Sequence, residues 1–240
     1  MITGDDKRRE LITDELNLFL GKNYVVTYHR TPIKAIEHIR ESAKRKPEYL
    51  MGHGSDMLVH KILDQIVDNY QPVMDEFDEI LDKLEEGIFT NKSEDFLSTI
   101  MQVKQDVFHL RRIVAPQRDT LNYLTRNPNA FIKTKNLMYF RDVFDHLFRI
   151  YGIVEGFHEN VTGILQAYFS YSSHTLNKTI QRMTVMATLS MPAIMIASIY
   201  GMNFKHMPEL HQPWGYAFSL CLMGGLSVAL LVWMKMKKWI

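Results

Sequence analysis

The polar and apolar positions divide the sequence into a charged part and an apolar part. Charged residues are frequent from Asp5 to Arg182 and then become rare. Two stretches, 183–204 and 212–234, contain no charged residue. Each has about 22 residues, and at about 1.5 Å per residue a helix of that length crosses a hydrocarbon core about 30 Å thick. The pattern predicts two membrane-spanning helices near the C-terminal end. The alternative is a pair of core helices in a soluble protein, which would have little around them to bury them.

The beginning of the sequence predicts a small α/β unit. Two short apolar runs, 16–20 and 24–29, flank a Gly-Lys-Asn turn, which is typical of a β-hairpin. A helix is expected next, with Thr31 as its N-cap and a proline at its first position, ending near residue 46. Residues 46–55 contain one proline and two glycines and are expected to form a loop.

From residue 56 onward the apolar residues recur at spacings of three and four, which predicts helices alone. The first expected helix covers 56–86 and the second covers 94–126. The third runs from 130 to Gly201, about 70 residues or about 105 Å. A helix of this length needs partners along its sides, so we expect a homo-oligomer.

Charge narrows the range of functions. The net charge is only +1, so bulk electrostatics favours neither nucleic acid nor an acidic partner. Lysines follow the second apolar stretch, and Lys178 with Arg182 precedes the first, which places both termini in the cytoplasm by the positive-inside rule. The single cysteine, Cys221, excludes an intrachain disulfide. The sequence has no nucleotide-binding loop and no nucleophile constellation, so we expect no enzyme.

The end of the first apolar stretch resembles the signature of CorA-type magnesium channels. The resemblance rests on Tyr200-Gly201-Met202-Asn203-Phe204, followed by Met-Pro-Glu-Leu at 207–210 and Trp-Gly-Tyr at 214–216. It implies a mainly α membrane protein in which a long stalk helix is continuous with the first transmembrane helix. It further implies a funnel-shaped homopentamer in the prokaryotic plasma or inner membrane. The family's N-terminal α/β domain is usually much longer, so the beginning of this chain resembles a remnant of it.

The pattern and the resemblance together predict a division into seven parts. These are a remnant of a cytoplasmic α/β domain (1–50), a cytoplasmic helical hairpin (51–129), a cytoplasmic stalk helix (130–182), a pore-lining first transmembrane helix (183–204), an external loop (205–213), a second transmembrane helix (214–234) and a basic cytoplasmic tail (235–240).

The resemblance makes Gly201, Met202 and Asn203 the expected selectivity filter. Mg²⁺ sheds its water reluctantly and prefers octahedral oxygen coordination, so a filter can hold the hydrated ion with oxygen dipoles. Gly201 can expose its carbonyl, Asn203 adds an amide oxygen, and Met202 would support their packing. Without the resemblance, a Gly-Asn helix C-cap is the simpler interpretation.

A stripe with heptad-like spacing precedes the filter, and the resemblance places it on the pore axis. Its asparagine and threonine would form oxygen rings, whereas its apolar members would narrow or dewet the pore. Periodicity alone equally allows the stripe to pack against the second span. The expected pore-lining residues are Asn177, Ile180, Thr184, Ala187, Met191, Ile194 and Ser198.

Regulation by Mg²⁺ is expected at carboxylates on the stalk. Asp142 and Asp145 lie three residues apart and share one helix face. By resemblance, Asp142 would bind a regulatory Mg²⁺ between subunits. The alternative is a solvated or arginine-paired stalk residue. The acidic run at 75–86 could concentrate cations but is also typical of a solvated helix face.

The expected function is passive, potential-driven Mg²⁺ influx, with other copies of the chain, membrane lipid and divalent cations as partners. Lys205 departs from the acidic residue that often follows the signature, and it would repel cations. His206 and His211 on the same loop could bind zinc or be ordinary surface residues. Two alternatives remain, a Co²⁺, Ni²⁺ or Zn²⁺ transporter of the same fold and a membrane-anchored helical scaffold.

Overall fold

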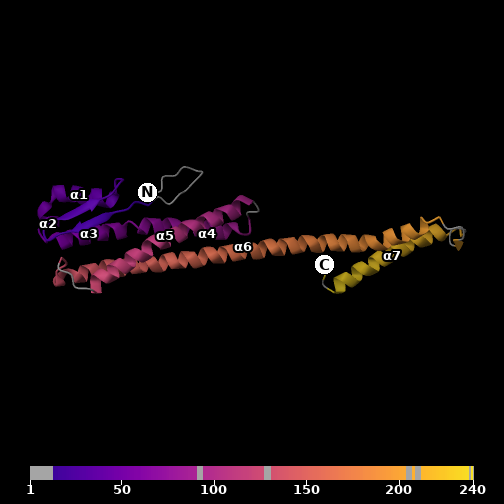
Figure 1. Cartoon of the computed structure of the whole chain (residues 1–240). Helices are drawn as coiled ribbons and strands as arrows, with labels where there is room; N and C mark the ends of the chain where they lie inside the picture. The colour runs from indigo at the N-terminus through magenta and orange to yellow at the C-terminus, as the bar shows by residue number, and fades with distance from the viewer. Residues whose placement is uncertain are drawn as a thin grey trace. The chain divides into compact units, whose positions relative to one another are not determined.

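The computed structural model describes residues 13–90, 94–126, 131–203, 207–208, 212–237 and 239. The chain divides into two compact units, residues 1–168 and 169–240, which we call the N-terminal and C-terminal units. Figure 1 labels most of the elements. In chain order they are β1 (Asn17–Leu20), β2 (Val25–Tyr28), α1 (Lys34–Arg45), α2 (Pro47–Met51), α3 (Ser55–Asp68), α4 (Gln71–Gly87), α5 (Glu94–Arg126), the 3-10 turn η1 (Thr134–Asn136), α6 (Leu137–Tyr200) and α7 (Gly215–Met236).

The predicted hairpin is confirmed. Strands β1 and β2 pair antiparallel, with Phe19 opposite Val26 and Leu20 opposite Val25. Leu20 and Val25 pack onto a cluster around Val59 of α3. Ser55 at the start of α3 donates its hydroxyl to the carbonyl oxygens of the two turn residues that follow β1, over 2.7 and 2.9 Å. A two-stranded sheet is marginal by itself, and α3 supplies the apolar surface that it needs.

Two local predictions in this region were wrong. Thr31 is not an N-cap: its hydroxyl donates to Asp14, and α1 begins at Lys34 after an extended Ile33. The expected loop at 46–55 contains the short helix α2, because a proline at its first position suits a helix start.

The expected single helix at 56–86 is two helices, α3 and α4, separated at Asn69 and Tyr70. Pro72 lies in the first turn of α4. A proline ring clashes with the carbonyl four residues earlier, here that of Asp68, so α3 ends at this residue. The sequence prediction missed this break because the apolar spacing continues across it.

Helices α4, α5 and α6 form the core of the N-terminal unit. Ring contacts join α4 to α6 through Phe77 and Phe157, and α5 to α6 through Phe96 and Tyr168. Buried positions on α5 and α6 alternate at spacings of three and four, as in a coiled coil. On α6 they are Phe140, Val143, Leu147, Ile150, Val154, Phe157, Val161 and Ile164.

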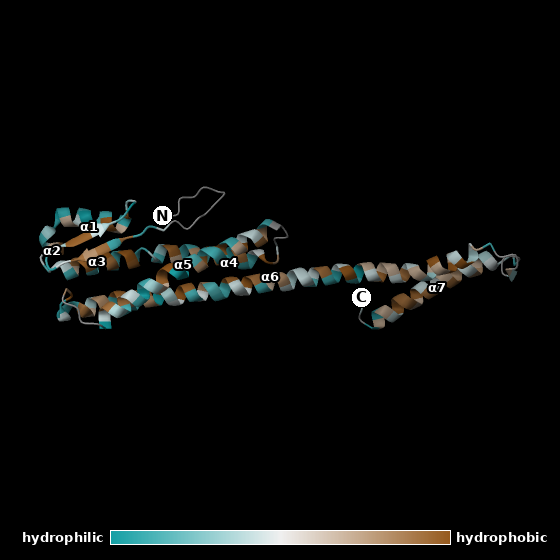
Figure 2. Ribbon diagram, viewed as in Figure 1, coloured by the Kyte–Doolittle hydropathy of each residue, from teal (hydrophilic) through white to brown (hydrophobic). Residues whose placement is uncertain are grey.

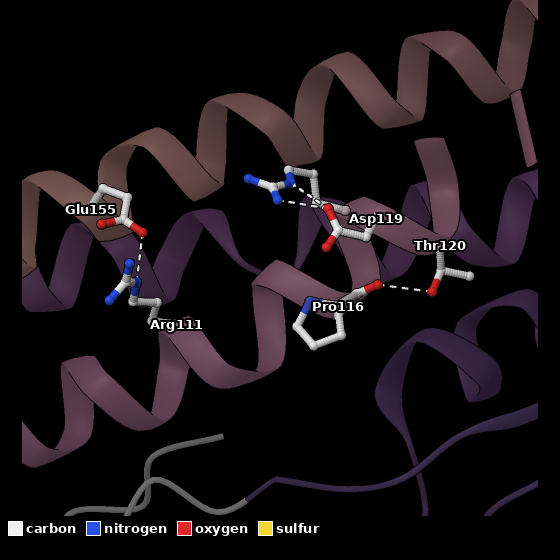
Figure 3. A network of polar contacts seen from close by, with 6 residues as sticks. Arg111, Pro116, Asp119, Thr120 and Glu155 are labelled. Carbon is white, nitrogen blue, oxygen red and sulfur yellow. Dashed lines mark hydrogen bonds and ion pairs between the residues drawn. The ribbon is translucent and has the colours of Figure 1, made fainter. Parts of the chain in front are cut away.

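Polar contacts flank this seam (Figure 3). Arg111 of α5 donates to Glu155 of α6 over 2.6 Å. The guanidinium of Arg118 lies 4.1 Å from the ring centre of Tyr151. Hydrogen bonding from Tyr151 and then from Arg111 lowers the pKa of Glu155. Pro116 lies inside α5, and the hydroxyl of Thr120 donates to its carbonyl oxygen over 2.8 Å.

Asp56 joins the start of α3 to the start of α6. It is 1% exposed, and one carboxylate oxygen accepts hydrogen bonds from the side chain of Asn136 (2.8 Å) and the backbone N–H of Lys133 (3.1 Å). Burial by itself raises the pKa of Asp56, but these hydrogen bonds and the charge of Lys133 outweigh it and lower the pKa. Gly54, with φ of 110°, precedes it, and a Cβ there would lie 2.8 Å from the Lys133 ammonium nitrogen.

The long third helix is present but begins later than expected. Helix α6 has 64 residues and starts at Leu137 after η1, whereas the sequence predicted a start at residue 130, which lies outside the described residues. Helix α7 has 22 residues, and Figure 2 shows it as mostly hydrophobic. Both α6 and α7 contain an apolar stretch long enough to cross a membrane.

Candidate metal transport pathway

In the C-terminal unit, α7 lies alongside the last part of α6 (Figure 1). On α6, the residues with reduced exposure lie on one face: Val185, Thr188, Leu189, Pro192, Ala193, Ile196 and Tyr200. On α7, they recur three or four residues apart: Gly215, Ser219, Met223, Ser227, Leu230 and Met234. Three of the α7 positions are Gly or Ser, and small residues allow two helices to approach closely in a membrane.

One hydrogen bond joins the two helices beside a proline. Pro192 lies within α6, where its missing N–H and its ring disturb the preceding turn. The hydroxyl of Ser227 on α7 donates to the carbonyl oxygen of Leu189, in that turn, over 3.0 Å. A proline in a membrane helix is tolerated where a neighbouring helix supplies such a donor. The sequence analysis does not single out Ser227. The available signal was a hydroxyl side chain in the second apolar stretch together with a proline in the first.

All seven residues of the expected pore stripe are exposed in the single chain. The exposed fraction is 52% for Ile180, 69% for Met191 and 64% for Ile194. The residues with reduced exposure lie on the opposite side of α6, so the stripe does not pack against α7. The stripe is a mixed polar and apolar surface that α7 leaves uncovered.

The hydroxyl of Thr184 within this stripe is oriented by its own helix. It donates to the carbonyl oxygen of Ile180 over 2.9 Å. A hydroxyl has one proton and two acceptor lone pairs. Because the proton is committed to the helix, the oxygen remains available as an acceptor.

Gly201, Met202 and Asn203 follow directly on the last turn of α6 and are all exposed. The N–H of Gly201 donates to Ala197 over 2.9 Å, and that of Met202 donates to Ile199 over 3.2 Å. A Cβ at Gly201 would lie 3.1 Å from the Ala197 carbonyl oxygen, so a side chain there would crowd the helix end. Within the described residues, no hydrogen bond to the Asn203 amide is present.

Four residues of the loop after the expected filter are outside the part of the chain that the structure describes. Lys205, His206, Glu209 and His211 lie outside the described residues. After the loop, the rings of Trp214 and Phe218 meet edge to face, with centroids 5.8 Å apart.

Asp142 and Asp145 lie on α6 in the N-terminal unit, and both are exposed. Asp142 lies near His60 of α3, which is 4% exposed. Burial lowers the pKa of His60, and the charges of Asp64 and Asp142 partly oppose that shift. The described part of the chain contains no group of three or more His, Cys, Asp or Glu residues arranged to hold a metal ion. A site at Asp142 would thus need ligands from elsewhere.

Comparison with known proteins assigns this arrangement to a family. A sequence model of the family described as CorA-like Mg²⁺ transporter protein matches residues 2–238. The chain belongs to this family. The CorA family comprises transporters, which agrees with the expectation that the chain is not an enzyme.

Two relatives show how much of a CorA protein the chain represents. It is 33% identical over 240 residues to the cobalt/magnesium transport protein CorA of Thermotoga maritima, covering all of this chain and 68% of that protein. It is 25% identical over 236 residues to the magnesium transport protein CorA of Wolinella succinogenes, covering 97% of this chain and 72% of that protein.

Solved structures share the fold. The complete structure of the CorA magnesium transporter from Methanocaldococcus jannaschii matches with a TM-score of 0.83 at 21% identity, over 93% of this chain and 71% of that one. The full-length CmaX protein matches with a TM-score of 0.73 at 17% identity, over 99% of this chain and 72% of that one. The long helix α6 and the apolar helix α7 are thus parts of a CorA-like fold.

Proposed function

We propose that this chain forms a homopentameric pore that admits Mg²⁺ passively, driven by the membrane potential, with both termini in the cytoplasm. The observation that carries the proposal is the exposed stripe on α6, since α7 covers only the opposite face. A membrane helix with one face packed on its own chain and a mixed polar and apolar face left open suits assembly around an axis. The names of the relatives, cobalt/magnesium and magnesium transport proteins, supply the substrate class.

In this proposal the cation first meets Gly201 and Asn203. The amide oxygen of Asn203, repeated around the axis, accepts hydrogen bonds from the water shell of the ion. Mg²⁺ holds that shell tightly, so recognition of the hydrated ion avoids the cost of dehydration. Met202, which is 51% exposed, would pack between neighbouring copies and hold the ring in shape.

Further along the stripe the cation meets alternating polar and apolar rings. Thr184 would present its free lone pairs to the water shell, since its proton is donated to Ile180. Asn177 would supply a second amide ring, and Ser198 a hydroxyl near the filter. Met191, Ala187 and Ile180 would form the constriction that closes the pore by dewetting, and Ile194 would narrow it on the filter side.

Closure is proposed to depend on cytoplasmic Mg²⁺ bound at Asp142, with Asp145 on the same exposed face. Because the carboxylates lie on α6, a cation bound there acts on the helix that carries the stripe. Asp142→Ala is expected to weaken the dependence of flux on internal Mg²⁺ and to leave the filter intact. Unchanged dependence would remove Asp142 from the proposal.

The deciding experiment is Mg²⁺ flux into proteoliposomes that contain the full chain, compared with an Asn203→Ala variant. Asn160→Ala, an exposed asparagine on the same helix, is the matched control. We expect selective uptake for the wild type and the control and its loss for Asn203→Ala. Equal flux from wild type and Asn203→Ala would overturn the filter.

Two other candidates are separated by the same assay. If Co²⁺, Ni²⁺ or Zn²⁺ is taken up in preference to Mg²⁺ when both are supplied, the transported ion in the proposal changes. The name of the Thermotoga maritima relative, a cobalt/magnesium transport protein, favours Co²⁺ among the three. Absence of flux from an intact oligomer would favour a membrane-anchored helical scaffold.

A further inference from the structure

The C-terminal unit has an uneven charge distribution, with basic residues in large excess. Residues 169–240 contain six Lys or Arg residues and one acidic residue, Glu209. In the sequence, five of the six cations occur in two groups. Lys178 and Arg182 precede the first apolar stretch, and the lysines at 235, 237 and 238 follow the second. An anionic group outside this unit is therefore needed to balance the excess positive charge.

Lys178 and Arg182 lie on the α7 side of α6. Arg182 lies seven residues before Leu189, and Lys178 lies seven residues before Val185. Residues seven apart, or two helical turns, lie on nearly the same face of a helix. The pore stripe runs through Asn177 and lies on a different side. The two cations therefore belong to the face where α7 packs and are set apart from the proposed ion path.

The end of α7 meets α6 at this same level. The side chain of Gln181 donates to the carbonyl oxygen of Trp239. The N–H of Trp239 donates to Met234 over 3.0 Å, and that of Lys237 donates to Trp233 over 3.0 Å, so the chain turns back at the end of the helix. Met234 is 2% exposed, which shows that this end is packed against its surroundings.

Among the described residues, no acidic side chain pairs with the cations at this end. Lys178, Arg182, Lys235 and Lys237 are all exposed, and none forms an ion pair within the described residues. Tryptophan rings lie at the same end, with Trp233 55% and Trp239 49% exposed. Tryptophan prefers the level of lipid headgroups, and arginine and lysine there bind phosphate groups.

We propose that Lys178 and Arg182 of α6, together with Lys235 and Lys237 at the end of α7, bind the phosphodiester of an anionic phospholipid. The chemistry recognised is a phosphate-bearing anion, and the source is a membrane lipid because the cations adjoin apolar surfaces that can hold acyl chains. Leu231 and Val232 on the last turns of α7 are 42% and 51% exposed. The Gln181–Trp239 hydrogen bond holds the two halves of the site together. The bound lipid would brace α7 against α6 at this end.

The test is native mass spectrometry of the purified full chain in detergent, titrated with phosphatidylglycerol and, separately, with phosphatidylcholine. We expect phosphatidylglycerol to bind more tightly than phosphatidylcholine. The double variant Lys178→Gln/Arg182→Gln should bind phosphatidylglycerol about 25-fold more weakly, at about fivefold for each charge removed. Arg182→Lys should keep most of the affinity, and it shows whether loss in the double variant reflects charge and not a damaged helix.

The matched control is Arg45→Gln/Lys83→Gln, which removes two exposed cations from the N-terminal unit. It should leave lipid affinity unchanged. Equal affinity for phosphatidylglycerol in wild type and Lys178→Gln/Arg182→Gln would overturn the site. Equal weakening in the control variant would also overturn it, because the affinity would then depend only on the net charge of the protein. Displacement of phosphatidylglycerol by inorganic phosphate at comparable concentration would overturn the lipid assignment in favour of a soluble anion. The Asn203→Ala variant should bind lipid normally, so failure of transport and failure of this site are distinguishable.

Discussion

The N-terminal unit and the C-terminal unit bury their apolar side chains to very different degrees. Within the described residues, the N-terminal unit has a continuous buried seam along α5 and α6, whereas only Ile196 and Met234 are buried apolar residues in the C-terminal unit. The first unit stabilises itself in water through its own core. The second leaves methionine, isoleucine and leucine uncovered, and lipid or other copies of the chain must supply their surroundings.

Helix α6 runs through both units and shows both degrees of burial. Helix α6 buries positions such as Leu147 and Val154 in the N-terminal unit. Continuing the same heptad count reaches Leu189 and Ile196, which are half-buried and buried in the C-terminal unit. The buried positions of the two units thus share one heptad count, although the intervening positions Thr175 and Arg182 are exposed.

The largest expected effect comes from removing a buried side chain from the N-terminal unit. Leu147→Ala should destabilise the protein by about 2–5 kcal/mol because it creates a cavity in packed surroundings. Leu226→Ala on α7, where the leucine is 46% exposed, is the matched variant and should have a much smaller effect. Thermal denaturation in detergent, followed by circular dichroism, measures both. A loss for Leu226→Ala as large as that for Leu147→Ala would contradict the comparison and indicate a protein interface on α7.

A smaller effect, dependent on pH, is expected at Asp56. Asp56→Ala leaves the Asn136 amide and the Lys133 N–H without their acceptor and should cost about 1–3 kcal/mol near neutral pH. Because the folded state lowers the pKa of this carboxyl from its ordinary 3.8, its stabilisation is present above that pH. It is lost as the pH falls through the lower folded pKa.

Melting curves of wild type and Asp56→Ala should therefore converge as the pH falls below about 4. Glu48→Ala, at an exposed carboxylate of α2, serves as the control and should show no such convergence. A difference between wild type and Asp56→Ala that is the same at all pH values would refute the role of the ionised carboxylate.

In the C-terminal unit, the hydrogen bond between Ser227 and Leu189 should contribute less to stability than the contacts of Asp56 do in the N-terminal unit. Ser227→Ala removes the donor to Leu189 and should cost about 0.6 kcal/mol, a typical value for a hydrogen bond between membrane helices. The effect should shrink when Pro192 is also replaced by alanine, because without the proline ring the turn can straighten and the Leu189 carbonyl oxygen can accept from the backbone N–H of Ala193, four residues later. A double-mutant cycle on apparent melting temperature measures this coupling. Additive effects of the two substitutions would show that the hydroxyl does not compensate for the proline.

The smallest effect is expected for the ion pair on the flank of the seam. Arg111→Met should lower stability slightly, since both partners are partly solvated, and the difference should diminish in high salt. Lys83→Met, at an i,i+4 pair on the surface of α4, should have no measurable effect. Urea titrations at low and high salt test the pair, and a difference that is unaffected by salt would point to packing of the arginine stem instead.

Several features of the fold could be predicted from the sequence because they depend on local spacing. The hairpin follows from two apolar runs around a short turn, and α5, α6 and α7 follow from helical periodicity and length. Two local predictions were wrong for different reasons. The apolar spacing continues across Pro72 and so does not reveal the break between α3 and α4. Thr31 has the residue type of an N-cap, but its hydroxyl bonds to Asp14, which is distant in sequence.

The candidate pathway was predictable as a set of residues but not as a surface. Heptad spacing selects Thr184, Met191 and their neighbours as one stripe of α6, and it equally selects Leu189 and Ile196 as another. Both stripes contain apolar and polar residues, so composition does not say which of them α7 covers. The roles of Gly201 and Asn203 remain proposals that rest on the family resemblance and on their exposure.

The sequence by itself determined the helical character of the chain after residue 56, the two apolar stretches long enough to cross a membrane and the membership of the CorA family, since these depend on residues that are close along the chain. Only the tertiary structure decided which face of α6 is packed and which is open, because that depends on where α7 returns. It also decided that Asp56 meets Asn136 and that Ser227 reaches the turn before Pro192. These contacts join residues far apart in the chain, and no local pattern of hydrophobic and polar positions encodes them.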